Sequence, residues 1–119
     1  MGTIKDFEDL EIWKMSRELV SLIYTDFGKC RDFSFKDQIS RAGLSIMNNI
    51  SEGFCRNSDS EFRQFLNISK GSAGEVKSMY YVAEDQEYVS PGTAADRRNR
   101  TQKLINGISC FMKYLKSSK

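Results

Sequence analysis

Apolar residues recur at helical spacing along most of the chain and predict four helices. We expect these helices to cover residues 7–27, 34–56, 58–87 and 93–116. In the second helix the apolar residues follow one another at spacings of four, three, four and four: Phe35, Ile39, Ala42, Ile46 and Ile50. Similar stripes run from Phe62 to Ala83 and from Leu104 to Leu115. Each helix is therefore expected to bury one face.

The first helix carries more apolar residues than one buried face requires. One stripe consists of Trp13, Val20, Ile23 and Phe27, and a second consists of Ile12, Met15, Leu19 and Leu22. An exposed apolar stripe of this length is unusual on a monomer. We therefore expect the second stripe to face another subunit in part, so that the chain forms a homo-oligomer.

Helix-start signals separate the four patterns. Ser58-x-x-Glu61 is a good capping box, whereas Ser34-x-x-Asp37 is a weak one. The fourth helix can begin either with Ser90 before Pro91 or with Thr93-x-x-Asp96. Short connections make neighbouring helices antiparallel. The prediction is an all-α fold, a single-domain up-down-up-down antiparallel four-helix bundle over residues 1–119.

Cysteine content and hydropathy bear on the cellular setting. The three cysteines are odd in number and widely spaced, which is typical of reduced thiols in a cytoplasm. No apolar stretch has the length needed to span a bilayer, and no secretory signal follows the charged residues Lys5 and Asp6. We expect a cytoplasmic protein with no membrane partner.

The chain contains no histidine. This removes the commonest general base, the Ser-His and Cys-His nucleophile pairs, and the ferritin-like di-iron site. The segment from Lys70 to Glu75, KGSAGE, lacks the spacing of a phosphate-binding loop. Its glycines, Gly71 and Gly74, are expected to let a neighbouring helix approach closely. We predict that the chain is not an enzyme and has no catalytic residues, cofactor or metal.

Charge is distributed unevenly along the chain. The segment from Arg97 to Lys119 has seven basic and no acidic residues, whereas the preceding 96 residues have a net charge of −5. A basic terminal helix indicates phosphate contacts, so the candidate nucleic-acid-binding residues are Arg97, Arg98, Arg100 and Lys103.

Internal ion pairing is the alternative interpretation of this charge, and the sequence leaves both open. The acids Glu84, Asp85 and Glu87 would meet the arginines across the last hairpin. The acids Glu8, Asp9 and Glu11 would likewise meet Lys113 and Lys116.

The segment between the second and third helices contains a group of polar residues and a glycine: Asn49, Glu52, Gly53 and Arg56. Gly53 suits a helix end, and Glu52 and Arg56 have the spacing of a helical ion pair. We expect Asn49, Glu52 and Arg56 to form one hydrogen-bonded joint with the start of the third helix. A ligand contact is the alternative.

Three motifs give the chain a family resemblance. They are FEDLEIWKMSREL (Phe7 to Leu19), DQISRAGLSIMNNISEGFCR (Asp37 to Arg56) and SEFRQFLNISKGSAGE (Ser60 to Glu75). These motifs resemble the four-helix bundle family of proteins encoded in intervening sequences of bacterial 23S ribosomal RNA genes. Met47 stands where the family often has proline, and Ser69 where it usually has alanine.

The resemblance implies a four-helix bundle that assembles as a ring-shaped pentamer. It also implies kinship with the accessory protein of diversity-generating retroelements, which binds nucleic acid and a reverse transcriptase. We therefore predict a non-enzymatic oligomeric interaction module that binds RNA or DNA, a nucleic-acid enzyme such as a reverse transcriptase, or both, through its basic fourth helix. The alternative is a structural homo-oligomer or protein–protein adaptor that binds no nucleic acid.

Overall fold

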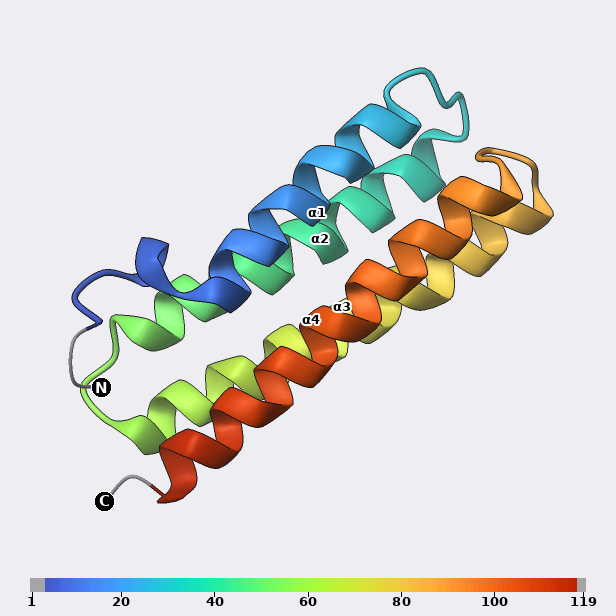
Figure 1. Cartoon of the computed structure of the whole chain (residues 1–119). Coiled ribbons are helices and arrows are strands. Elements are labelled where there is room, and N and C mark those ends of the chain that lie inside the picture. Colours follow the sequence, from blue (N-terminus) through green and yellow to red (C-terminus); the bar gives the residue numbers. More distant parts are fainter. Residues whose placement is uncertain (1–3, 118–119) are drawn as a thin grey trace.

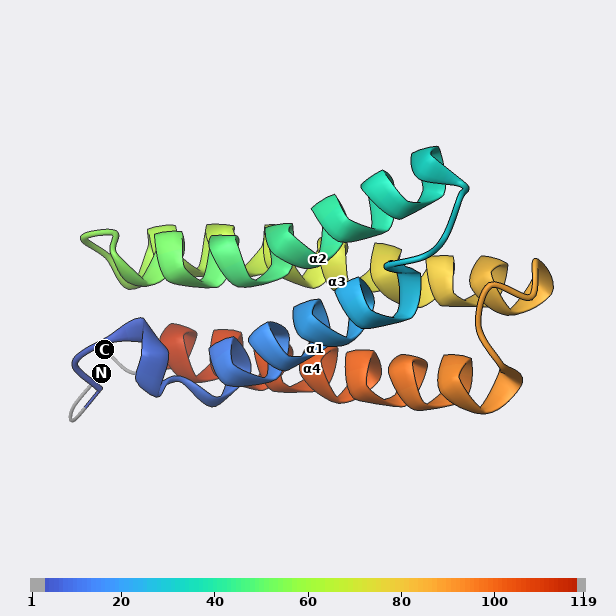
Figure 2. The same cartoon turned by 90° about the horizontal axis from the view of Figure 1, so that it is seen from above.

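Four long helices run along a common axis (Figures 1 and 2). This computed structural model describes residues 4–117. A short 3₁₀ turn, η1 (Phe7–Asp9), is followed by α1 (Glu11–Phe27), α2 (Phe33–Phe54), α3 (Asp59–Asp85) and α4 (Pro91–Ser117). The described part of the chain measures 47 × 21 × 20 Å and contains no strand. The predicted all-α four-helix bundle is confirmed. Lys119, counted among the basic residues above, lies outside the described part.

The core follows the predicted stripes in α2 and α3. All five apolar residues of the α2 stripe are buried, and Leu66, Val76 and Tyr80 of α3 are fully enclosed. α2 is helical without interruption through Met47. No helix within residues 4–117 is long and apolar enough to cross a membrane.

The expectation that residues 7–27 form one helix was wrong. The segment is not one helix, because Leu10 is extended (φ −75°, ψ 128°) between η1 and α1. This break lets Leu10 enter the core, where it is 5% exposed, and lets Phe7 meet Trp13 edge-to-face with ring centroids 5.3 Å apart. In addition, the core residues come from both stripes. Ile12 and Leu19 of the second stripe are buried in the bundle, whereas Met15 and Leu22 are half-buried. That the second stripe faces another subunit in part stays a prediction.

The helix starts differ in how well their caps were predicted. Ser58 caps α3 as expected, accepting from the Glu61 amide at 3.1 Å. Ser90, the first of the two alternatives, caps α4 by accepting from the Thr93 amide at 3.1 Å. α2 starts at Phe33, where Asp32 accepts from the Phe35 amide, so Ser34 is not the cap. The Asp32 carboxylate also accepts from the Tyr88 hydroxyl at 2.6 Å.

α3 ends in an unusual turn. The amides of Glu87 and Tyr88 donate to the carbonyls of Glu84 and Ala83, the paired bonds of a Schellman motif. Glu87 occupies the position that favours glycine and has φ 59°. The turn brings Tyr88 to the start of α2, where its ring meets that of Phe35 with centroids 5.3 Å apart.

Candidate interaction surfaces

Arg97, at the start of α4, is held by a buried ion pair. Its guanidinium donates two hydrogen bonds of 2.8 Å to the Asp26 carboxylate of α1, from Nε to Oδ2 and from Nη2 to Oδ1. The two side chains are only 15% and 6% exposed. The Tyr80 hydroxyl of α3 donates to Asp26 Oδ2 at 2.8 Å. One carboxylate therefore ties together α1, α3 and α4.

Two pKa shifts reflect this arrangement. The hydrogen bonds to Asp26 raise the pKa of Arg97 above its already high value. Burial, followed by the hydrogen bond to the Asp26 carboxylate, raises the pKa of the Tyr80 phenol well above its usual range. Both groups keep their protons over the whole physiological pH range, so the pair is a permanent structural feature rather than a switch.

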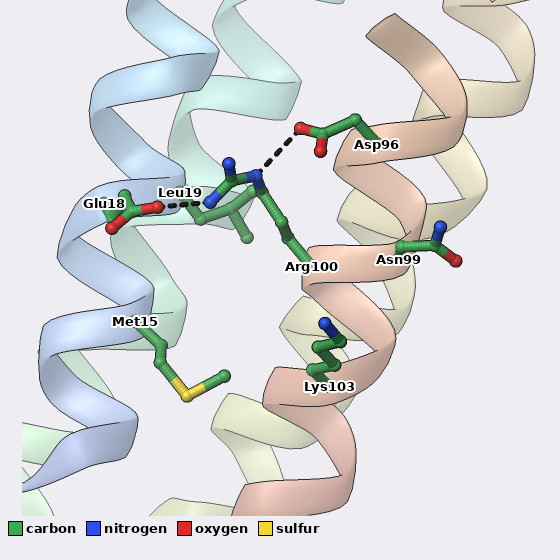
Figure 3. A pocket seen from close by; sticks show the side chains of 7 residues that line it. All are labelled: Met15, Glu18, Leu19, Asp96, Asn99, Arg100 and Lys103. Atoms are coloured by element: carbon green, nitrogen blue, oxygen red, sulfur yellow. Dashed lines mark hydrogen bonds and ion pairs between the residues drawn. The ribbon is translucent and has the colours of Figure 1, made fainter. Parts of the chain in front are cut away.

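Arg100 continues the charged cluster toward the surface (Figure 3). It donates from Nε to the Asp96 carboxylate at 2.8 Å and pairs through Nη1 with Glu18 of α1. Asp96 also accepts from Arg97 at 2.6 Å. Hydrogen bonds from Arg100 and Arg97 lower the pKa of Asp96. A cavity of about 340 Å³ lies between α1 and α4 beside these ion pairs. It is lined by Glu18, Asp96 and Arg100, and also by Lys103.

Arg98 is directed toward α3. Its Nη1 donates to the Glu84 carboxylate at 2.8 Å, and its guanidinium lies 4.1 Å from the centroid of the Tyr81 ring. The side chain is 17% exposed. This is one of the cross-hairpin ion pairs that the sequence predicted.

Three of the four candidate nucleic-acid-binding residues thus have carboxylate partners: Arg97, Arg98 and Arg100. Only Lys103 forms no ion pair with the described residues. Two of the three arginines pair with acids of α1, which the sequence analysis did not foresee. The pairs expected between the acids near Glu8 and the lysines Lys113 and Lys116 do not form within residues 4–117. Nucleic-acid binding by these four residues stays a prediction.

A second cavity opens between α1 and α4 toward the end of α4. It has a volume of about 550 Å³. Two acids, Asp9 and Glu11, line it, and the rest of the lining is mainly apolar: Ile4, Leu10, Ile12, Met15, Gly107, Cys110, Phe111 and Tyr114. Met15 lines both this cavity and the charged one. We call the two together the α1–α4 groove. Cys110 and Tyr114 are exposed at its edge, and the Tyr114 ring stacks on that of Phe111.

Comparisons with known proteins place this bundle in a family. The family model of the 23S rRNA-intervening sequence protein matches residues 8–110. The chain belongs to this family. A similar solved structure is that of a protein with unknown function from the S23 ribosomal protein family of Bacteroides thetaiotaomicron. Its sequence is 24% identical to that of this chain, and the two structures superimpose with a TM-score of 0.80. The match covers 86% of this chain and 98% of the Bacteroides chain. No curated protein matches the chain.

Residues that carry the family resemblance lie largely where α2 meets α3. The Ser45 and Ser72 hydroxyls are 2.8 Å apart across the two helices, and Gln38 donates to Glu75 at 3.1 Å. Ser69, in place of the family's usual alanine, is buried and donates to the Ile46 carbonyl at 2.7 Å. These residues therefore hold α2 against α3.

The predicted joint of Asn49, Glu52 and Arg56 forms only in part: Arg56 pairs with Glu52 and lies 4.7 Å from the centroid of the Phe65 ring of α3, but Asn49 bonds elsewhere. Asn49 donates to the Ser45 carbonyl and hydroxyl, at 2.8 and 3.0 Å, because its amide lies one turn after Ser45 on the side that faces α3. Glu52 and Arg56 form the expected pair at 2.7 Å, but both are about half exposed, so the pair contributes little.

Gly53 has a different role from the one predicted. It lies inside α2 and is buried, so it does not end the helix. A Cβ atom at Gly53 would lie 2.8 Å from side-chain atoms of Phe62 and Phe65. The missing side chain lets α3 approach α2 closely.

Proposed function

We propose that this family member is a non-enzymatic interaction module that assembles with further copies of itself through the α1–α4 groove. The observation that carries the proposal is the apolar part of that groove. It leaves Met15, Phe111 and Tyr114 in contact with solvent on one side of the molecule. Burying such side chains is worth about 25 cal/mol for each Å² of apolar surface removed from water.

The charged part of the groove would set the register of the assembly. Glu18, Asp96, Arg100 and Lys103 line the cavity that continues from the apolar part. Acidic and basic groups are mixed there, so a second copy could meet each with the opposite charge. Electrostatic complementarity of this kind fixes orientation more than affinity. A ring of five copies is the arrangement that the family resemblance implies.

The absence of histidine from the sequence supports a non-enzymatic role. Residues 4–117 also contain no cluster of three or more acidic or cysteine side chains suited to a metal ion. The adaptor role toward a reverse transcriptase or another protein, and the cytoplasmic location, stay predictions.

Light scattering coupled to size-exclusion chromatography tests the assembly. We expect the wild-type chain at micromolar concentration to have a mass that is a multiple of 13.7 kDa. Tyr114→Glu should shift it toward the monomer, because a carboxylate would be buried against apolar side chains. Circular dichroism would verify that the variant keeps its helices.

Tyr24→Glu is the matched control. Tyr24 is 50% exposed and Tyr114 is 47% exposed, but Tyr24 lies outside the groove, beside Phe33. We expect this variant to assemble like the wild type. A wild-type mass of 13.7 kDa, or monomers from Tyr24→Glu but not from Tyr114→Glu, would refute the proposed interface.

A further inference from the structure

The outward side of the α3–α4 hairpin is rich in basic residues. Between Arg63 and Lys77, α3 has one acidic residue, Glu75, which accepts a hydrogen bond from Gln38 and therefore lies on the side of α3 that faces α2. α4 has no acidic residue from Arg97 to Ser117. Arg63, Lys70 and Lys77 recur every seven residues, so they lie on one side of α3. That side faces α4, because Lys77 Nζ donates to Gln102 Oε1 of α4 at 2.7 Å.

α4 contributes further lysines to this side. Helices α3 and α4 run side by side along their whole length (Figure 1). The antiparallel register that pairs Lys77 with Gln102 and brings Arg98 over Tyr81 places Lys116 level with Arg63. Lys113 lies about one turn before Lys116 and is also exposed. We call this surface the α3–α4 face and define it by five residues: Arg63, Lys70, Lys77, Lys113 and Lys116.

These cations have no acidic partners in the described structure. Within residues 4–117 none of the five forms an ion pair, and the hydrogen bond of Lys77 to Gln102 leaves its charge uncompensated. The arginines of α4, in contrast, all have carboxylates within 3 Å. Five uncompensated positive charges on one side of a hairpin attract a polyanion.

Two glycines of α3 leave open space in the middle of the face. Gly71 and Gly74 are exposed, and a Cβ atom at either position would meet nothing within 4 Å. The expectation that these glycines accommodate a neighbouring helix was therefore wrong for the helices of this chain. Their positions beside Lys70 leave bare helix backbone next to the cations. An extended phosphate backbone could pass close to α3 there.

We propose that the α3–α4 face binds the phosphate backbone of a double-stranded nucleic acid. Arg63 and Lys77 are 14 residues apart, which is about 21 Å along a helix. This length corresponds to about six base pairs of a duplex. Lysines act as point charges on phosphates and read no base, so the binding is independent of sequence.

A duplex fits the face better than a single strand. Binding of single strands relies on aromatic side chains on which bases stack. Tyr81, four residues after Lys77 on α3, is 53% exposed, but the Arg98 guanidinium lies 4.1 Å from the centroid of its ring and occupies one of the two ring faces. The five residues that define the face are all cations, and the duplex has the higher density of phosphates.

Fluorescence anisotropy with labelled 20-base-pair RNA and DNA duplexes, and with one of their single strands, tests the proposal on the full chain. We expect the wild type to bind both duplexes more tightly than the single strand and to weaken steeply as salt increases. Lys70→Gln combined with Lys116→Gln should weaken duplex binding about tenfold or more at low salt. It should reduce the slope of log affinity against log salt by about 2, because each lost phosphate contact accounts for about 0.9.

The matched control removes the same charge elsewhere. Lys14 and Lys29 are exposed and form no ion pair within the described residues, but they lie on α1 and after it. Lys14→Gln combined with Lys29→Gln should bind like the wild type. Gly74→Leu should weaken duplex binding with no change of charge, because its side chain would hold the phosphates away from α3.

Three results would overturn the proposal: no duplex binding by the wild type at 50 mM salt, equal losses in the control and in the Lys70/Lys116 variant, or tighter binding to the single strand. Light scattering on the same samples separates this face from the α1–α4 groove. The Lys70/Lys116 variant should keep the wild-type mass, so the groove proposal and this one can fail independently.

Discussion

The arginines at the start of α4 and the lysines of the α3–α4 face have the same charge but opposite surroundings. Arg97 has two carboxylate partners and is largely buried, whereas Lys70 and Lys116 have none within residues 4–117. Guanidinium groups suit buried, bidentate pairs, and ammonium groups are more strongly hydrated. The comparison separates charge that holds the bundle together from charge that is free to bind a partner.

The two regions also differ in how closely their side chains are packed. At the arginine end, α1, α3 and α4 converge on Asp26, and the rings of Phe27, Phe35 and Tyr88 pack in sequence with centroids 5.3 Å apart. Along the α3–α4 face, Gly71 and Gly74 have no neighbours at all within 4 Å of an added Cβ. Substitutions should therefore be costly in the first region and harmless to stability in the second.

Asp26→Ala should have the largest effect. It leaves Arg97 buried beside Asp96 alone and removes the acceptor of the Tyr80 hydroxyl. Removing one partner of a buried ion pair costs about 3–5 kcal/mol. Urea denaturation would measure this loss in the free energy of unfolding. A loss below about 1 kcal/mol would mean that the Asp26–Arg97 pair is not structural.

Gly53→Ala and Gly74→Ala should have opposite effects on the free energy of unfolding. The added methyl group at Gly53 would clash with Phe62 and Phe65, which costs about 1–3 kcal/mol. At Gly74 the methyl group meets nothing, so the higher helix propensity of alanine should stabilise the chain by about 0.5–1 kcal/mol. Thermal unfolding of both variants would show this. A destabilised Gly74→Ala variant would indicate that the α3–α4 face is packed against something.

Glu87→Gly, in the turn between α3 and α4, should stabilise the chain by a smaller amount. Glu87 has φ 59°, a conformation that costs a non-glycine residue of order 1 kcal/mol. Glycine removes most of that strain but adds freedom to the unfolded chain. We expect a net stabilisation of about 0.5 kcal/mol, measured by urea denaturation. A loss of stability would show that the Glu87 side chain has a role of its own.

A pH effect should appear where Tyr88 bonds Asp32. The hydrogen bond to the Asp32 carboxylate raises the pKa of Tyr88 to about 12. A raised pKa means that the stabilisation is complete below pH 10 and is lost as the pH rises toward 12. Unfolding experiments between pH 9 and 12 should show a decline that is smaller in Tyr88→Phe. Equal declines in the two proteins would contradict the assignment.

The sequence predicted local features of this fold better than distant ones. The stripe from Phe35 to Ile50 and the cap at Ser58 depend on spacings within one helix, and both are present. The bond between Asp26 and Arg97 joins residues 71 positions apart, so no helical spacing could reveal it. Hydropathy likewise could not show the extended Leu10, because an apolar residue at a helix start fits the same pattern.

The charge pattern of the sequence predicted part of the basic surface but not all of it. The basic character of α4 was visible in the composition, and so was one partner, Glu84. Which basic residues have no acidic partner depends on how the two helices pack. The packing puts Lys70 and Lys77 of α3 on the same side of the hairpin as Lys113 and Lys116 of α4, with Lys77 level with Gln102. Sequence reasoning confined to α4 missed the contribution of α3, although the seven-residue spacing from Arg63 to Lys77 was a usable signal.

Urea denaturation of two double variants tests the central distinction most directly. Arg97→Gln with Arg98→Gln, and Lys70→Gln with Lys116→Gln, each remove two positive charges. We predict that the arginine variant loses about 3 kcal/mol or more of the free energy of unfolding, because it leaves Asp26 buried without its ion partner. The lysine variant should stay within about 0.5 kcal/mol of the wild type. Equal losses in the two variants would contradict the division between structural arginines and free lysines.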